Sequence, residues 1–380
     1  MALASATGLA SFDQSAGEFL DLSNELAEII RRDNSAFIQR LGISGTAAFE
    51  TSHSWMEDAL NPNTFTGAED MDSSETTFDV TTGHGSRLRV GALIKNVSEA
   101  GKTEVMQVTA ISTDALTVVR GYGSTSGETH SNGATFQIIA TPAQENQDPP
   151  SDESRTRTKV TNYTQIFQKG INVSHTMRAV MQAGVADEFT FQVTRRLMEI
   201  MRELDSSVIN GIKSADAGSD TSLRSMGGLI EFVSQSGGNT TTTSEALGLS
   251  VINDMAKQIW DDGGTPNFIL VGGKQKRAIS QLDQSARRSD YTTNSAGYVV
   301  ERVLTDLGFV LDVIVDPWVA DDVAIIGDIN KVRVMPLQND AMRAEDLAKT
   351  GRGSKAQVTG QYTMEVRNAK EAFAIHTNLT

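Results

Sequence analysis

Five histidines are the residues of this chain best suited to bind a metal or to transfer a proton. They are His53, His84, His130, His175 and His376. They lie far apart in the sequence, and none pairs with another at the spacing of metal ligands. Glu50 and His53 have the Glu-x-x-His spacing of di-iron helix bundles, but such sites need a second copy and further glutamates. The sequence therefore predicts no metal site.

Two other short patterns resemble parts of catalytic or cofactor-binding motifs. Gly272-Gly273-Lys274 follows an apolar stretch, as in a phosphate-binding loop, but Gln275 stands where that loop needs a hydroxyl. A helix that begins with glycines explains this pattern better. Ser174 and the adjacent His175 would point to opposite faces of a strand, and there is no G-x-S-x-G motif. We predict no catalytic residue, no cofactor and no enzymatic activity.

Trp55 and a group of basic residues are the candidate interface residues. Trp55 lies in the polar stretch 47–62. A large aromatic residue in such a stretch is often an anchor, so we predict that its ring packs on another subunit or another module. Packing in the core of its own domain is an equal alternative. The basic group is predicted to meet acidic neighbours on another subunit, with a solvated face as the alternative. It consists of Lys274, Lys276, Arg277, Arg287 and Arg288.

The composition excludes several classes of protein. A length of 380 residues favours two or three modules. The net charge of −15 argues against general nucleic-acid binding, which needs a basic surface. The chain has no cysteine, so it has no disulfides and no thiolate metal sites. No apolar run approaches the ~20 residues of a membrane helix, and the N-terminus does not resemble a secretory signal. We therefore expect no membrane association.

The longest predicted element is a helix over residues 183–213. Apolar residues recur there at steps of three and four, the period of one helix face. They are Phe189, Val193, Leu197, Met201, Leu204, Val208 and Ile212. Asp187 and Glu188 stand where the start of a helix favours negative charge. The helix would be about 40 Å long, so other elements are expected to pack on it. A long core helix of an enzyme is the alternative for this stretch alone.

The region before this helix predicts an arm, a β module and two strands. Residues 1–20 predict an extended arm, and residues 23–40 predict a helix. Residues 76–141 contain short β-rich runs separated by turn residues, typical of a small, independently folded all-β barrel or sandwich. Residues 141–154 predict a linker. Residues 156–176 alternate between apolar and polar, which favours a long β-hairpin arm or a strand pair.

The region after the long helix predicts strands and helices in alternation. Residues 227–233 predict a strand or turn, residues 246–260 and 273–282 predict helices, and residues 267–271 predict a buried strand. Further strands are predicted at 309–315, 322–326, 331–337, 357–366 and 372–376, with a polar loop at 340–355. Helices that flank a mixed sheet indicate an α+β or α/β domain.

Several ordered stretches resemble the major capsid proteins of tailed bacteriophages. FETSHSWMEDAL at 49–60 resembles an N-terminal element of that family, and VTNYTQIFQKGINVSHT at 160–176 is similar to its arm segment. The long helix and GGTPNFILVGGKQKRAIS at 263–280 also match. EVMQVTAISTDALTVVRGYGST at 104–125 resembles the β module that these proteins insert. The resemblance extends from about Leu22 to the C-terminus.

This resemblance implies an α+β Hong Kong 97-type capsid fold with a small inserted all-β domain. That fold has an N-terminal arm, an E-loop, a peripheral (P) domain with a long spine helix, and an axial (A) domain. The implied boundaries are 1–60 for the arm, 61–154 for the inserted domain and linker near the E-loop, 155–182 for the E-loop strands, 183–219 for the spine helix, 220–350 for the A domain and 351–380 for returning P-domain strands.

The resemblance also implies a major capsid protein whose hexamers and pentamers form an icosahedral phage head. Its partners would be other copies of the chain together with scaffold, portal and decoration proteins. The shell would enclose double-stranded DNA without sequence-specific binding, and the inserted module would project away from the genome. The implied location is the virion, after assembly in the host cytoplasm. No motif selects a lysine–asparagine pair, so we predict no covalent cross-link. The alternatives are an encapsulin-type nanocompartment shell protein and an α+β enzyme.

Overall fold

The computed structural model describes residues 36–380, except 59, 144, 146–155, 181–186, 217, 220–221, 282–300 and 350. The arm expected at 1–20 lies outside the described residues, as do most of the helix expected at 23–40, most of the linker, Arg287 and Arg288. The chain divides into two compact units. Unit 1 combines Met1–Trp55 with Lys159–Thr380, and unit 2 is Met56–Thr158.

Unit 1 contains a long sheet built around one central strand. This strand, β17 (Gly353–Val366), pairs antiparallel along one edge with β9 (Gln165–Ser174). Its other edge pairs with β16 (Arg343–Leu347) and then with β15 (Val332–Pro336). Alternate residues are buried in the second half of β9 and in β17 as far as Tyr362, because successive side chains of a strand point to opposite faces. From Tyr362 to Val366 every residue of β17 is buried.

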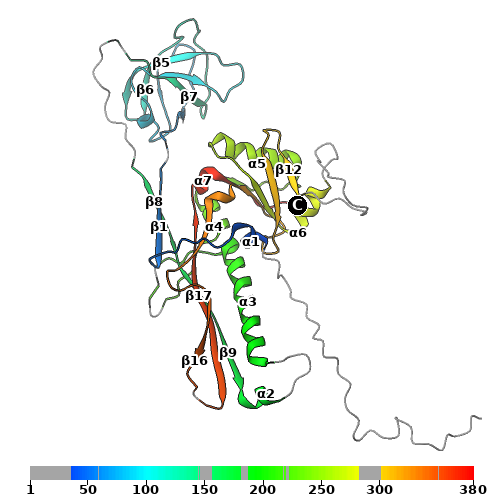
Figure 1. The fold of residues 1–380 in the computed structure, drawn as a ribbon. Coiled ribbons are helices and arrows are strands. Elements are labelled where there is room, and N and C mark those ends of the chain that lie inside the picture. The colour runs from blue at the N-terminus through cyan, green and yellow to red at the C-terminus, as the bar shows by residue number, and fades with distance from the viewer. Residues whose placement is uncertain are drawn as a thin grey trace, which may run out of the picture. The chain divides into compact units, whose positions relative to one another are not determined.

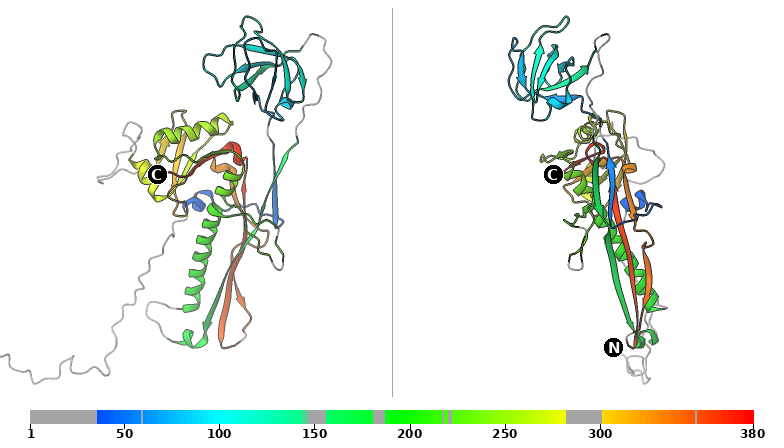
Figure 2. Two further views of the ribbon diagram at one scale, coloured as in Figure 1. Left: turned by 180° about the vertical axis from the view of Figure 1, so that it is seen from behind. Right: turned by 90° about the vertical axis from the view of Figure 1, so that its left-hand side faces the viewer.

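The predicted long helix is α3 (Glu188–Asn210), which lies along β9 and β17 (Figures 1 and 2). Asp187 caps its N-terminus, where the carboxylate accepts a hydrogen bond from the Phe189 backbone N–H at 3.3 Å. The helix ends before Gly211. A Cβ atom at Gly211 would lie 2.3 Å from the Ser207 carbonyl oxygen, so the turn that follows α3 requires glycine.

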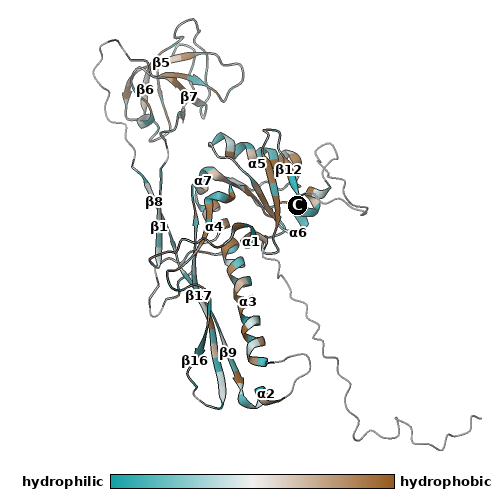
Figure 3. Cartoon of the chain, in the orientation of Figure 1, coloured by the Kyte–Doolittle hydropathy of each residue, from teal (hydrophilic) through white to brown (hydrophobic). Residues whose placement is uncertain are grey.

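The fully buried face of α3 is confined to its C-terminal half. That half packs against β17, α4 (Leu229–Gln235) and α1 (Ala36–Leu41). The apolar residues that are fully buried are Ile200, Leu204, Val208 and Ile209. The predicted apolar stripe is therefore only partly correct, because Leu197 is 40% exposed and Ile212 lies beyond the end of the helix. Figure 3 shows α3 in alternating hydrophilic and hydrophobic bands, as expected for an amphipathic helix.

Unit 1 also contains a six-stranded mixed sheet in the order β10-β18-β14-β11-β13-β12. Its strands are β10 (Asn239–Thr241), β11 (Phe268–Val271), β12 (Arg302–Leu304), β13 (Val310–Val315), β14 (Ala324–Gly327) and β18 (Phe373–His376). Every residue of β11, β14 and β18 is buried. Such strands are covered on both faces.

The two faces of β11 contribute to different apolar cores. Phe268 and Leu270 belong to the core that includes the buried face of α3. Ile269 and Val271 belong to the core formed with α5 (Leu249–Asp261) and α6 (Gly273–Ser280). The remaining helices of unit 1 are α2 (His175–Ala179), α7 (Ala369–Ala372) and a 3-10 turn at Ile329–Lys331. No described helix is long and apolar enough to cross a membrane.

Two predictions from the C-terminal half were wrong. The stretch 227–233 predicted a strand or turn but contributes to α4, because Leu229 and Val233 lie one helical turn apart and are both buried. The polar loop predicted at 340–355 contains β16 and the start of β17. Strand β16 is mostly exposed, so it lacks the alternating pattern by which a half-buried strand is recognised. Segment 351–380 is also divided, since β17 lies in the long sheet and β18 in the six-stranded sheet.

The hairpin or strand pair predicted over 156–176 is wrong in its pairing. Strand β8 (Thr158–Tyr163) pairs with β1 (Ser52–Glu57), while β9 pairs with β17. Only Thr164 separates β8 from β9, which is too short for the two-residue turn of a hairpin. The chain therefore passes from unit 1 into unit 2 through β1 and returns through β8.

Unit 2 is a closed β-barrel. Its strand order is β2-β7-β4-β5-β6-β3. The strands are β2 (Thr64–Thr66), β3 (Thr77–Asp79), β4 (Leu93–Asn96), β5 (Val105–Ser112), β6 (Ala115–Val119) and β7 (Thr135–Ala140), with a 3-10 turn at Gly85–Arg87. The two edge strands meet where the Ala68 N–H donates to the Asp79 oxygen at 2.8 Å and the Thr81 N–H donates to the Thr66 oxygen at 2.9 Å. Closure leaves no unpaired edge.

Candidate shell-forming elements

Trp55 is buried within its own unit. The residue is 7% exposed, and its ring centroid lies 5.7 Å from that of Phe232 in α4 and 6.0 Å from that of His53. This burial favours the alternative that the ring packs in the core of its own domain, where α4 brings Phe232 to it. The interface role of Trp55 stays a prediction.

We expect Trp55→Ala to lower the free energy of unfolding of the subunit by about 3 kcal/mol, because the ring leaves a cavity against Phe232. Thermal unfolding of the purified full-length chain would measure this loss. Met56→Ala is a suitable control, since the neighbouring Met56 is 66% exposed. A normal melting temperature together with failed assembly would instead support the interface prediction.

The basic group lies partly on the surface of α6. Lys274 and Arg277 are exposed, whereas Lys276 is half-buried. Burial lowers the pKa of Lys276, and the charge of Glu301 opposes this shift. Gln275, which stands where a phosphate-binding loop would need a hydroxyl, is fully buried and donates to the Asp321 carbonyl at 2.7 Å. This hydrogen bond fixes α6 to the loop that contains Asp321. Lys274 and Arg277 remain interface candidates, and Arg287 and Arg288 lie outside the described residues.

The histidines that the structure places in contacts do not converge on one site. His84 Nδ1 accepts a hydrogen bond from the Thr66 N–H at 3.0 Å within unit 2. His376 is fully buried in β18, with Nε2 2.9 Å from the Glu245 carboxylate and Nδ1 3.0 Å from the Thr377 carbonyl. Across the described residues, no cluster of three or more His, Cys, Asp or Glu side chains is arranged to hold a metal ion. These contacts support local packing.

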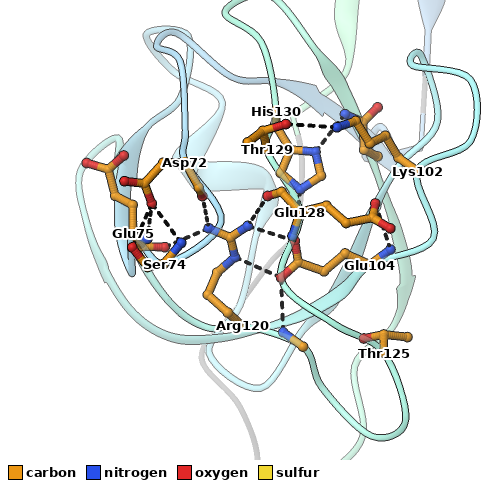
Figure 4. Close-up of polar contacts among 12 residues, drawn as sticks. Asp72, Ser74, Glu75, Lys102, Glu104, Arg120, Thr125, Glu128, Thr129 and His130 are labelled. Atoms are coloured by element: carbon orange, nitrogen blue, oxygen red, sulfur yellow. Dashed lines mark hydrogen bonds and ion pairs between the residues drawn. The ribbon is translucent and has the colours of Figure 1, made fainter.

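The main polar cluster of the barrel was missed by the sequence analysis (Figure 4). The Arg120 guanidinium donates to both oxygens of the buried Glu104 carboxylate, at 2.8 and 2.7 Å. It also donates to the carbonyls of Asp72 and Glu75, at 2.7 and 2.8 Å. His130 Nε2 lies 3.1 Å from Glu104 and completes the group. One side chain thus holds together loops that are far apart in sequence.

The Glu104 carboxyl is ionised over the whole ordinary pH range. Burial acts to raise its pKa, but hydrogen bonds from Arg120, from the Glu128 and Gly121 backbone N–H groups and from His130 outweigh burial. Together they lower the pKa from 4.5 to about 2. The folded barrel therefore favours the ionised form. This contribution to stability is complete above pH 4.5 and is lost as the pH falls towards 2.

The strand that leaves the barrel is fixed firmly to unit 1. Asn162 of β8 is fully buried, and its amide donates to the carbonyls of Met364 and Gly227 at 2.7 and 3.2 Å. Its side-chain oxygen accepts the Gly227 N–H at 2.8 Å. Arg224 donates to the Thr164 carbonyl at 2.5 Å. The two-stranded β1–β8 ribbon thus begins from a rigid base on the long sheet.

Unit 1 combines a long helix lying on a long sheet with a six-stranded mixed sheet and a two-stranded ribbon, and unit 2 is a small β-barrel. Among solved structures, the chain is similar to the capsid of an empty GTA particle, with a TM-score of 0.52 and 12% identity over 98% of this chain and 100% of that chain. The capsid of the native GTA particle gives 0.51 and 11% identity over 100% of both chains. A chain from Mycobacterium phage Bobi gives 0.49 and 11% identity over 98% and 99%.

This fold is that of the Hong Kong 97-type capsid proteins, which are α+β shell proteins. The family model of the SU10 major capsid protein matches residues 5–380. The chain therefore belongs to the SU10 major capsid protein family and is a structural protein of a phage head. No curated protein matches the chain.

Proposed function

We propose that this chain is the repeating subunit of an icosahedral phage head and that its copies assemble into hexamers and pentamers around double-stranded DNA. The match of the SU10 major capsid protein family over residues 5–380 carries this proposal. The elongated body of α3 and the long sheet supports it, because a shell subunit must present extended surfaces to several symmetric neighbours. The net charge of −15 favours enclosure of DNA without tight binding to it.

We assign the elements to the parts of the capsid fold as follows. Helix α3, the long sheet and its base form the P domain, and the β1–β8 ribbon forms the E-loop that carries the barrel of unit 2. The six-stranded sheet with α5 and α6 forms the A domain. Strand β18 belongs to this sheet, so the assignment of 351–380 to the P domain is restricted to β17. The N-terminal arm assigned to 1–60 loses β1 to the ribbon, and the E-loop assigned to 155–182 loses β9 to the long sheet.

The proposed partners are other copies of the chain together with scaffold, portal and decoration proteins. We place assembly in the host cytoplasm and the final location in the virion. The closed barrel supports a module that projects from the shell, because it has its own core and no strand edge to share. An encapsulin-type compartment is the second candidate, and it would enclose a protein cargo instead of DNA.

The test is production of the chain with and without the scaffold protein of its phage. We expect particles that sediment far ahead of the monomer and show a closed outline by negative-stain electron microscopy. Packaged DNA in particles from infected cells supports a phage head, whereas co-purification of an enzyme cargo supports the encapsulin-type alternative. A chain that stays monomeric under all these conditions would contradict both.

A further inference from the structure

Two buried carboxyl groups meet where the C-terminal half of α3 packs against the six-stranded sheet. Asp205 follows Leu204 on the buried face of α3, and Asp316 follows β13. Both residues are 0% exposed. A carboxyl on the apolar face of a long helix is unexpected, because a buried charge without a partner is costly.

Asp316 accepts two backbone hydrogen bonds from different segments. The Phe37 N–H in α1 donates to Oδ2 at 3.3 Å, and the Trp318 N–H donates to Oδ1 at 2.9 Å. These bonds favour a negative charge on Asp316. They also make Asp316 the point at which α1 and the loop after β13 are joined.

Asp205 lacks comparable support. Neither of its carboxyl oxygens has a regular hydrogen bond from an N–H or O–H group of the described residues. It interacts instead with the Asp316 carboxyl, and more weakly with the Ile38 backbone N–H. Two carboxyl groups can form a hydrogen bond only when one of them holds a proton, so a bond between these two buried groups needs one proton for the pair.

The charges around the pair do not remove this requirement. The charged side chains on the elements packed around the pair are Arg40 of α1, Glu199, Arg202 and Glu203 of the C-terminal half of α3, Glu231 of α4, Asp312 of β13, Asp321 and Asp322 of the loop after it, Arg333 of β15, and Lys355 and Glu365 of β17. None of these contributes to the pKa of Asp205 or Asp316, and Arg40 is paired with Asp312. Burial first, and the charge of Asp316 second, raise the pKa of Asp205 from 3.8 to about 7, while the Ile38 backbone N–H opposes the shift. Burial also raises the pKa of Asp316.

We propose that Asp205 and Asp316 share one proton, and that the hydrogen bond made by this proton, the latch, holds α3 against α1 and the loop after β13. Loss of the proton weakens this junction. The latch is a property of the single subunit and does not depend on the proposed function. In it, Asp205 donates its proton to Asp316, while Asp316 accepts from Phe37 and Trp318. When both carboxyls are ionised, two like charges face each other in an apolar core.

The direction of the pH effect follows from proton binding. Between pH 3.8 and about 7 the folded subunit binds more protons at this pair than the unfolded chain does. The stability from the latch therefore falls as the pH rises through this window and stays constant above it. The two groups titrate together, so the window belongs to the pair and not to either residue.

The first test compares the full-length chain with Asp205→Asn from pH 5 to pH 8. The asparagine amide donates to Asp316 at every pH, so it replaces the proton permanently. We expect the melting temperatures of the two proteins to be similar at pH 5 and that of the variant to be several degrees higher at pH 8. Glu203→Gln, which removes an exposed carboxylate two residues before Asp205, should show a constant difference from the wild type. A constant difference for Asp205→Asn would overturn the proposal.

The second test needs only the wild-type chain, so it remains decisive if Asp205→Asn does not fold. Hydrogen exchange followed by mass spectrometry, with times scaled for the intrinsic pH dependence, should show lower protection of α1 and of residues 204–210 at pH 7.5 than at pH 5.5. Helix α5, which belongs to the other apolar core, should show equal protection and serves as an internal control. Unchanged protection at the junction would overturn the proposal.

Discussion

Replacing Leu204 by aspartate is expected to prevent the subunit from folding. Leu204 is 0% exposed and belongs to the core that joins α3, the long sheet and the six-stranded sheet. The new carboxylate would lie beside Asp205 and far from any partner, at a cost of several kcal/mol. A domain's total stability is about 5–15 kcal/mol. Soluble yield and particle counts after expression should therefore both fall close to zero.

Glu203→Gln is the matched control for this helix face. Glu203 is exposed, about 100° around α3 from Leu204, and forms an ion pair with Lys169 of β9 within the same chain. Loss of an exposed pair changes the free energy of unfolding by about 0.5 kcal/mol. Normal folding of Leu204→Asp, or collapse of Glu203→Gln, would show that the buried face of the helix is wrongly assigned.

Arg120→Met is expected to have the largest effect within the barrel. Arg120 is nearly buried, and without it the fully buried Glu104 carboxylate loses its charged partner. Breaking a buried ion pair in this way costs about 3–5 kcal/mol. Urea unfolding of the segment 56–158 should show this loss, because the segment has its own closed core.

Two further variants make the barrel experiment specific. Lys102→Met removes an exposed cation that contacts the Thr129 hydroxyl at 3.1 Å, and it should change stability by about 0.5 kcal/mol or less. Adding Glu104→Gln to Arg120→Met removes the unpaired charge, so the double variant should recover part of the loss. An equal loss in Lys102→Met and Arg120→Met would show that the Arg120 cluster has no special role.

The elements with a clear period were predictable from the sequence. The steps of three and four around Leu204 placed α3 within a few residues of its observed ends, and the apolar run ending at Val271 identified β11. The sequence also predicted the β-rich region, since its short runs separated by turn residues form the barrel strands. Local patterns were sufficient there because each element makes its own regular contacts.

The features that were missed depend on contacts between distant segments. β1 and β8 lie on either side of the barrel in the sequence, so no local signal favoured their pairing over a hairpin of β8 and β9. Arg120 and Glu104 flank neighbouring strands, yet each resembles an ordinary surface charge when considered alone. Asp205 falls on an apolar face, and only its contact with Asp316 gives it a role.

The family assignment depended on ordered resemblances and not on any single motif. The stretch around Trp55 contributed to the assignment, although its ring packs in its own unit. The structure then added a fold similar to that of the solved GTA capsids, and the family match over residues 5–380 showed the family. The interface roles of Lys274 and Arg277 stay predictions, because they concern contacts between subunits.

The most direct test of the shell assignment is a cryo-electron microscopy reconstruction of assembled particles. We expect a closed icosahedral shell in which each hexamer and pentamer position fits one copy of the α3 body with its long sheet. Density for the barrel of unit 2 should project from the outer surface. A reconstruction whose repeating subunit does not fit this fold, or particles that never form from soluble, folded chain with its scaffold protein, would contradict the assignment.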